Sequence, residues 1–327
     1  MVLQASALLN VATPERNKWL KGKSIVAISQ FDPSGTAYTF DVAEEYREIF
    51  ADNRRRLKEI LFAFQLANLF FEPSTRTSSS FASAMFALGG DVISINGVTY
   101  SSMEKGEDLI HTVLTEQEYV DAIVLRHKDV GSAAKAAGRL GIPLINGGDG
   151  EGEHPTQALL DLYTILREQK RINGLTITLI GDLKRGRTVH SLTELLLSYD
   201  VRLNFVAPEV SRMPVHIIEK VKASGVPYQE YTDLHEVQKT TDVFYMTRVQ
   251  KERFDSEEEY NKVKGLYRID MAFMAGIKSD AKLMHPLPCL DEIAREVDVH
   301  PNAAYFRQVG NGKFIRMALL AMVLGQA

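Results

Sequence analysis

The fold is decided by the stretch Phe70-Phe71-Glu72-Pro73-Ser74-Thr75-Arg76-Thr77. The apolar run at 66–71 predicts a buried strand, and Pro73 ends it. A helical pattern begins at once, because apolar residues recur at i, i+3, i+4 and i+7 from Phe81 until Gly89-Gly90. The strand therefore leads directly into the N-terminus of a helix.

Three hydroxyl groups and a guanidinium lie at this junction, from Ser74, Thr75, Thr77 and Arg76. The free amides and positive dipole end of a helix N-terminus favour an anion, and an arginine adds a planar fork that suits phosphate oxygens. A helix that is only capped needs one hydroxyl rather than three around an arginine. The junction therefore predicts a phosphate site. It is not a Walker loop, because the glycines and lysine of that motif are absent.

Length and charge restrict the class of protein. The chain has 327 residues, enough for two domains of ordinary size, with 45% hydrophobic and 24% charged residues. Basic minus acidic residues is 38 − 42 = −4, which argues against an electrostatic nucleic-acid binder. Arginines clustered within an acidic protein suggest a small anionic substrate instead.

Cys289 is the only cysteine, which excludes an internal disulfide and a cysteine-based zinc site and fits a reducing, cytoplasmic compartment. The histidines show no metal-ligand spacing. No apolar run approaches membrane-spanning length. The apolar patch at 5–11 has no basic region before it, so it is a poor signal peptide.

Short apolar runs alternate with polar tips and helical patterns along the chain. The strands are predicted at 66–71, 122–125, 143–145, 175–180, 203–206, 243–246 and 283–284. Such alternation indicates parallel sheets covered on both faces, in which ligands bind beyond the carboxyl ends of the strands. Polar residues follow most of these predicted strands directly, a regularity that is not expected of ordinary surface residues.

We predict an α/β protein of two doubly wound lobes, each a parallel sheet with helices on both faces, linked by helices. The glycine-rich stretch 147–152 is the best boundary, so residues 1–150 form one domain and 151–309 the other. A helix from Pro155 to about Arg167 would join the lobes. A C-terminal helix, within 310–327, would pack back on the first domain.

Arg126, Arg187 and Arg248 lie on predicted strand tips, as does Arg76. Each arginine alone is more often a solvated surface group. Together they indicate a substrate with several negative charges. The stretch 181–187 follows a strand and precedes a helix, but its glycine spacing is wrong for a dinucleotide site.

Two further residues have a functional interpretation only if a phosphate site lies nearby. His154 precedes the helix predicted from Pro155, where a lone histidine is usually a capping or packing group. It becomes an oxyanion donor only beside a phosphate site. Lys105, in the polar loop at 100–106, is either an exposed lysine or a lid residue that reaches an anion.

Seven ordered motifs carry a family resemblance. They are residues 71–77, 105–107, 126–127, 154–158, 186–192, 248–253 and 285–288. They closely resemble those of the aspartate carbamoyltransferases, from about residue 66 to the C-terminus and more weakly before it. The Ser-Thr-Arg-Thr element alone would mark only the wider carbamoyltransferase family.

The resemblance implies a carbamoyl phosphate-binding domain followed by an aspartate-binding domain. Carbamoyl phosphate would bind at Ser74, Thr75, Arg76 and Thr77, with Arg126. Its carbonyl oxygen would be held by Thr77, Arg126 and His154, and its amide would meet Gln157. Aspartate would be held by Arg187, Arg248, Gln250 and Lys105, with backbone contacts from Leu287.

In this family a serine and a lysine from the neighbouring subunit complete the phosphate site. Ser101 and Lys105 match them, so the likeness implies a homotrimer with shared active sites. The expected catalytic residues are Arg76, Thr77, Lys105, Arg126 and His154. The implied reaction, an early step of pyrimidine biosynthesis, needs no cofactor and no metal. A regulatory chain or fused pathway domains stay open.

One residue departs from the family pattern. The family usually has an arginine directly after His-Pro-Leu-Pro, whereas this chain has Cys289. The charge and the anchoring of that loop are therefore in question, and with them the affinity for aspartate.

Two other readings compete with this one. An ornithine carbamoyltransferase would need a site for a cationic side chain and typically carries a cysteine within its His-Cys-Leu-Pro element, but here the element is His285-Pro286-Leu287-Pro288. A non-catalytic scaffold could keep the fold. The joint presence of Arg76, Lys105, Arg126, His154, Arg187 and Arg248 argues against it.

Overall fold

The structure, a computed structural model, describes residues 4–97, 106–248, 256–258 and 263–327. The chain divides into two compact units, one of residues 1–163 and 311–327 and the other of residues 164–310. The divisions fall inside two helices, α6 (Pro155–Gln169) and α11 (Tyr305–Val323). The domain boundaries expected at 150 and 309 remain predictions.

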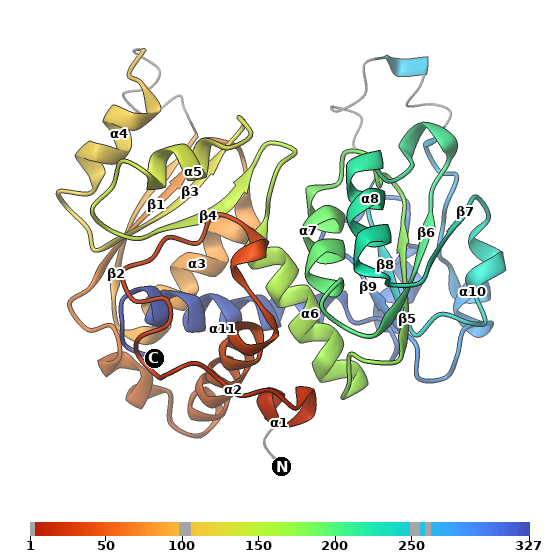
Figure 1. Ribbon diagram of the computed structural model, residues 1–327, viewed down its shortest axis with the longest axis horizontal. Coiled ribbons are helices and arrows are strands. Elements are labelled where there is room, and N and C mark those ends of the chain that lie inside the picture. Colours follow the sequence, from red (N-terminus) through yellow and green to blue (C-terminus); the bar gives the residue numbers. More distant parts are fainter. Residues whose placement is uncertain (1–3, 98–105, 249–255, 259–262) are drawn as a thin grey trace. The chain divides into compact units, whose positions relative to one another are not determined.

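The first unit is built on a four-stranded sheet of order β2-β1-β3-β4, in which every pairing is parallel (Figure 1). Its strands are β1 (Gln65–Phe70), β2 (Asp91–Asn96), β3 (Ala122–His127) and β4 (Leu144–Asp149). Its helices are α1 (Ala5–Leu9), η1 (Ile28–Gln30), α2 (Pro33–Asn53), η2 (Arg54–Glu59), α3 (Thr75–Leu88), α4 (Leu109–Glu116) and α5 (Ser132–Ala137).

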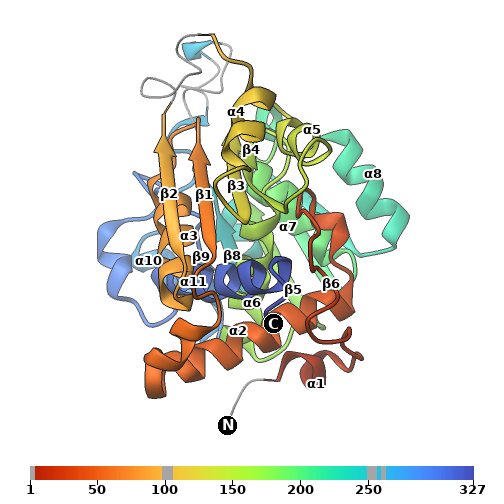
Figure 2. The same cartoon turned by 90° about the vertical axis from the view of Figure 1, so that its left-hand side faces the viewer.

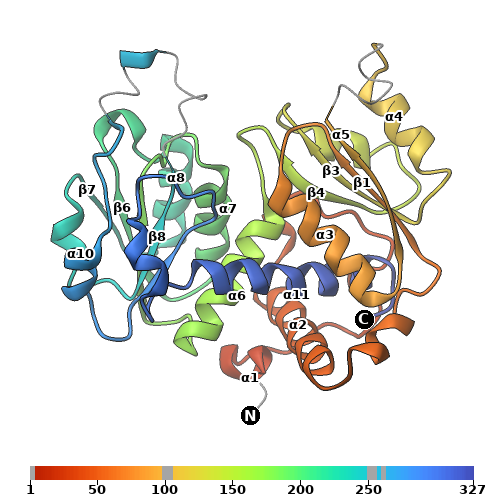
Figure 3. The same cartoon turned by 180° about the vertical axis from the view of Figure 1, so that it is seen from behind.

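Helices cover both faces of this sheet. One face carries Ala67, Leu69, Ile123 and Leu125, which form a buried cluster with apolar residues of α4 and α5. Side chains alternate along a strand, so Asn68 and Arg126 point to the opposite face. Figures 2 and 3 show α3 and the C-terminal part of α11 on that face.

The second unit holds a five-stranded parallel sheet of order β7-β6-β5-β8-β9. Its strands are β5 (Leu175–Ile180), β6 (Val201–Val206), β7 (Tyr228–Tyr231), β8 (Val243–Met246) and β9 (Lys282–Met284). Its helices include α7 (Arg187–Leu196), η4 (Glu209–Ser211), α8 (Val215–Ser224), η5 (Leu234–Val237), α10 (Met271–Ala275) and η7 (Arg295–Val299). A buried cluster joins one face to η5, α10 and η7, and Figure 1 shows α7 and α8 on the other.

The predicted fold class, two parallel sheets each covered on both faces, is confirmed. The helix start after Pro73 and its end at Gly89 are also confirmed, since Ser74 is the N-cap of α3 and Gly89 (φ 96°) its C-cap. The described residues contain no helix long and apolar enough to cross a membrane.

Some boundaries were wrong. The strand predicted at 143–145 extends as β4 to Asp149, into the glycine-rich stretch taken as the domain boundary, because these residues are buried and pair with β3. Arg126 and His127 lie inside β3 rather than after it. The strands β2 and β7 were not predicted, because both are partly exposed edge strands and lack a continuous apolar run.

Candidate active site

The predicted phosphate site lies at the first turn of α3, in the first unit. Ser74 precedes the helix, and its side chain makes no capping hydrogen bond to the described first turn. Thr75 and Arg76 are exposed, whereas Thr77 is buried. The Ser74 hydroxyl is therefore not used as an ordinary cap, and Thr75 and Arg76 in this first turn are exposed to solvent.

Asn68 fixes this helix against the sheet. Its side-chain Nδ2, in β1, donates to the backbone oxygen and the hydroxyl of Ser78 at 3.2 and 3.0 Å. The Ser78 hydroxyl in turn donates to Asn96 Oδ1, at the end of β2, at 3.1 Å. A fully buried asparagine is costly unless it is hydrogen-bonded. Its polar bonds set the position of α3 along the strands.

Arg126 lies beside the same turn, near the end of β3, and is 8% exposed. Its Nη1 donates to the backbone oxygen of Gly147 at 3.3 Å, and its Nη2 forms an ion pair with Glu72 Oε1 at 3.1 Å. Because Glu72 is two residues before Ser74, the pair holds the guanidinium next to the phosphate-binding stretch. Glu72 is a positioning residue to which the sequence analysis gave no role.

His127, next along β3, is turned to the other face. It is buried, and its Nδ1 accepts from the Asp129 backbone amide at 3.1 Å. Burial lowers the pKa of His127, although the Asp129 carboxylate opposes this. The ring is therefore held neutral more firmly than a free histidine.

His154 and Gln157 lie at the start of α6, and both are buried. The loop before α6 is held by Asp149, whose carboxylate accepts from the backbone amides of Glu153 and Gly131, both at 2.8 Å. Gln157 Nε2 donates to Asp161 Oδ1 at 2.8 Å. The first unit thus contains the predicted residues at the N-terminus of α3, at the end of β3 and at the start of α6.

In the second unit Arg187 is the first residue of α7 and is buried. Arg248 follows β8 by two residues and is half-buried. Gly181 (φ 114°) lets the end of β5 approach this segment, because a Cβ there would lie 2.5 Å from the Thr247 backbone oxygen. The glycine that resembled a dinucleotide motif serves this close approach.

A pocket within the second unit contains Arg248. Its lining also includes Thr247, Lys264, Asp291 and Glu292. Lys264 is a second cation in this lining, beside the carboxylates of Asp291 and Glu292, and the sequence predicted no role for it. No motif marked it, since a single lysine outside a strand tip looks like any surface lysine.

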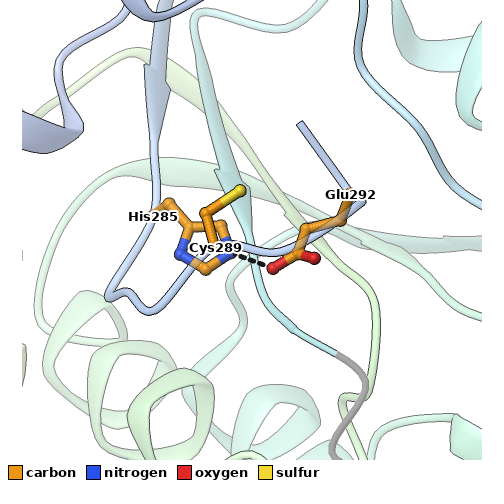
Figure 4. A group of neighbouring side chains, drawn as sticks. All are labelled: His285, Cys289 and Glu292. Atoms are coloured by element: carbon orange, nitrogen blue, oxygen red, sulfur yellow. Dashed lines mark hydrogen bonds and ion pairs between the residues drawn. The ribbon is translucent and has the colours of Figure 1, made fainter. Parts of the chain in front are cut away.

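The segment after β9 is held by His285, which is 1% exposed. The Leu287 backbone amide donates to His285 Nδ1 at 2.8 Å, so Nε2 carries the proton and donates to Glu292 Oε1 at 2.9 Å (Figure 4). Leu287 has φ 57°, a conformation that costs a leucine free energy. The histidine offsets that cost and fixes the backbone of Leu287.

Glu292 completes this anchoring. Its Oε2 accepts from the Leu290 backbone amide at 3.1 Å. Burial opposes its ionisation, yet the hydrogen bond from His285 keeps the pKa of Glu292 below its usual value. The loop is therefore anchored even though an arginine is missing at 289.

Cys289 lies beside this pair and is half-buried (Figure 4). Burial raises the pKa of its thiol to about 11, and the Glu292 charge adds to the effect. The donor atoms of His285, Cys289 and Glu292 lie within 4.8 Å of one another, so the cluster could hold a cation after side-chain rotation. In this structure both ring nitrogens of His285 already make hydrogen bonds, to the Leu287 amide and to Glu292.

Ser101, Lys105 and Gln250 lie outside the described residues, and their predicted roles remain predictions.

Both halves of the chain match described families. The family "Aspartate/ornithine carbamoyltransferase, carbamoyl-P binding domain" matches residues 23–167, and "Aspartate/ornithine carbamoyltransferase, Asp/Orn binding domain" matches residues 173–323.

Similar proteins agree. The aspartate carbamoyltransferase catalytic subunit of Thermococcus onnurineus is 48% identical over 93% of this chain and 98% of its own length. The multifunctional protein pyr1-3 of Dictyostelium discoideum is 47% identical over 94% of this chain, which covers 14% of that protein. The aspartate transcarbamoylase of Trypanosoma cruzi, in complex with N-(phosphonacetyl)-L-aspartic acid, has a TM-score of 0.89 at 41% identity, covering 93% of this chain and 97% of that one.

Proposed function

The chain belongs to the aspartate/ornithine carbamoyltransferase family, and we propose that it transfers the carbamoyl group of carbamoyl phosphate to L-aspartate. The products are N-carbamoyl-L-aspartate and phosphate, in an early step of pyrimidine biosynthesis. The Trypanosoma cruzi relative has been crystallised with carbamoyl phosphate and aspartate together, which supports this substrate pair.

The observation that carries the proposal is Arg126, buried and held between Glu72 and Gly147 beside the first turn of α3. A buried guanidinium at an open helix N-terminus suits a phosphate ester whose carbonyl must be polarised. We propose that the amides and side chains of residues 74–77 bind the phosphate. Thr77, Arg126 and His154 would stabilise the carbonyl oxygen as it becomes negative.

The second substrate would bind in the second unit. The guanidinium groups of Arg187 and Arg248 suit the two carboxylates of aspartate better than the cationic side chain of ornithine. Gln250 and Lys105 would add contacts from outside the described residues. The Leu287 backbone amide already donates to His285, so its carbonyl oxygen would accept a hydrogen bond from the substrate.

The reaction joins the two. The α-amine of aspartate, once deprotonated, forms a bond to the carbamoyl carbon and gives a tetrahedral oxyanion. The oxyanion collapses as the bond to the phosphate oxygen breaks, and the departing phosphate is a candidate acceptor for the amine proton. Alignment of the reactants can lower the barrier by up to roughly 7–11 kcal/mol. Each oxyanion donor adds on the order of 10²–10³ in rate.

We also propose an oligomeric state, a compartment and a class of partner for this chain. The chain would form a homotrimer in which Ser101 and Lys105 of one subunit complete the phosphate site of the next. It would act in the cytoplasm, as the single half-buried cysteine suggests. A regulatory chain or fused pathway domains could accompany it, since some relatives are multifunctional proteins.

A colorimetric assay for carbamoyl-aspartate tests the proposal directly. We expect product with carbamoyl phosphate and aspartate, and none when ornithine replaces aspartate. Citrulline formation from ornithine would favour the ornithine reading instead. Absence of either product would favour a non-catalytic scaffold.

A further inference from the structure

In the first turns of α6, the Gln157 side chain is hydrogen-bonded to a fully buried carboxylate, that of Asp161. Gln157 and Asp161 are one helical turn apart, and Gln157 Nε2 donates to Asp161 Oδ1 at 2.8 Å. Asp161 is 0% exposed. A carboxylate at such a position is costly unless charge and hydrogen bonds compensate it.

Arg316, in α11, supplies a compensating charge within the same unit. It is buried, and its Nη1 donates to the Ser80 hydroxyl of α3 at 2.9 Å. Burial lowers the pKa of Arg316 to about 10, and Asp161 is the carboxylate that opposes this lowering. A carboxylate and a guanidinium from two helices therefore share one buried region.

The surroundings leave these groups little freedom. The Arg316 guanidinium lies over the Phe81 ring, 5.1 Å from its centroid. A Cβ at Gly312 would lie 2.7 Å from Arg316 Nη1 and 3.0 Å from Leu160 Cδ2, so glycine allows α11 to pack closely here. Asp161 thus has a fixed environment, which is what a residue needs in order to orient another.

The chemistry of the pair fixes the orientation of the Gln157 amide. A carboxylate has no proton to donate, so only the NH₂ end of the amide can face Asp161. The carbonyl end, Oε1, must then point elsewhere, as an acceptor. Without Asp161, either end of the amide could be presented to a ligand.

We propose that Asp161 is a positioning residue that makes Gln157 present its carbonyl oxygen to the NH₂ group of carbamoyl phosphate. This inference rests on the proposed function, because it assigns Gln157 to the carbamoyl amide. It adds a basis for selectivity. Acetyl phosphate has a methyl group in place of the NH₂ and cannot donate to an acceptor, so it gains nothing from the fixed amide.

The test compares two ligands in one variant, Asp161→Asn. Its amide can face Gln157 with either end, so the orientation is lost. We expect kcat/KM for carbamoyl phosphate to fall about 10–100-fold, as for the loss of one strong hydrogen bond. The inhibition constant of acetyl phosphate, measured by competition, should change less than about threefold.

A double-mutant cycle with Gln157→Ala separates positioning from general damage. If Asp161 acts through Gln157, then adding Asp161→Asn to Gln157→Ala should cause little further loss of selectivity for carbamoyl over acetyl phosphate. Equal weakening of both ligands, full additivity in the cycle, or unchanged selectivity in Asp161→Asn would each overturn the inference. An inactive wild-type enzyme would instead contradict the proposed function.

Asp161→Asn leaves Arg316 in the interior without this counter-charge and could prevent folding. The pair Asp161→Asn with Arg316→Met removes both buried charges together, which proteins tolerate better. It should show the same loss of selectivity, and retained selectivity would again contradict the inference. Thermal melting of each variant reports stability separately.

Discussion

In the first unit the charged and polar side chains of the site stand on regular elements, whereas in the second unit several stand on loops. Arg126 is part of β3, Thr77 of α3 and Gln157 of α6. By contrast, Arg248 follows β8 and Leu287 follows β9, each outside a strand or helix. A helix or strand places a side chain through local hydrogen bonds, but a loop needs contacts from residues distant in the sequence.

The two units also differ in the contacts that fix their site residues. Arg126 is fixed by Glu72, which follows the end of β1, and by Gly147, which lies within β4. Leu287 depends on His285, which depends in turn on Glu292 and Gln308. We therefore expect changes in the first unit to act on the chemical step. Changes in the second should act on aspartate binding.

The largest effect is expected for Arg126→Ala. Turnover should fall on the order of 10³-fold, because the carbonyl oxygen loses a preorganised charged donor. Steady-state kinetics measures this, and circular dichroism checks that the fold is intact. Arg202→Ala, at an exposed position of β6, is the matched control and should remain active. A near-fully active Arg126→Ala would remove this residue from the chemistry.

Mixing of two inactive variants tests whether the phosphate site is complete within one chain or is shared between two subunits. Arg76→Ala and Lys105→Ala should each be nearly inactive. When the two are mixed and allowed to exchange, about a quarter of the sites in a cyclic trimer should combine intact Arg76 with intact Lys105. Activity should return to that extent in the assay. No recovery, with exchange verified by mass, would count against shared sites.

Arg187→Ala should separate binding from chemistry. We expect the KM for aspartate to rise about 10–100-fold, since one charge-assisted bond to a carboxylate is lost. The KM for carbamoyl phosphate should change less than about twofold. Arg212→Ala, exposed in the same unit, serves as the control. An unchanged KM for aspartate would show that the dicarboxylate does not use this side chain.

Cys289→Arg restores the residue usual in the family. Because His285 and Glu292 already anchor the loop, the KM for aspartate should change less than about fivefold, the range of a partly exposed ion pair. Aspartate saturation curves of this variant and of Cys289→Ser measure the effect. A much lower KM in the arginine variant alone would mean that the loop is under-anchored.

The smallest effect is a pH dependence of stability. Burial lowers the pKa of His127 below its ordinary 6.5, so the folded state binds fewer protons than the unfolded state just below that pH. The stability contribution is present above pH 6.5 and is lost as the pH falls toward the folded pKa. In His127→Gln the melting temperature should therefore depend less on pH below pH 6.5 than it does in the wild type. If both proteins show the same dependence of melting temperature on pH, His127 makes no such contribution.

Glu292 provides the contrast in the second unit. Its pKa is lowered from 4.5, so its contribution is present above that value and is lost only as the pH falls further, through the folded pKa. Glu292→Gln should thus leave the profile near pH 6 unchanged and alter it below pH 4.5.

The sequence by itself determined the alternation of strands and helices and the phosphate-binding stretch. Both follow from local patterns: an apolar run, a proline, hydroxyls and an arginine at a helix N-terminus. The start of α6 at Pro155 was predicted to the residue, because proline suits the first helical position, and α3 begins directly after Pro73 as expected.

Only the tertiary structure decided which groups hold these residues. Glu72 against Arg126, Asp161 against Gln157, and Glu292 against His285 involve side chains with no signature of their own. The same holds for Lys264 and for the edge strands β2 and β7, which no apolar run marks. A residue's partner depends on where the folded chain brings distant segments, and that is fixed by packing rather than by neighbouring residues.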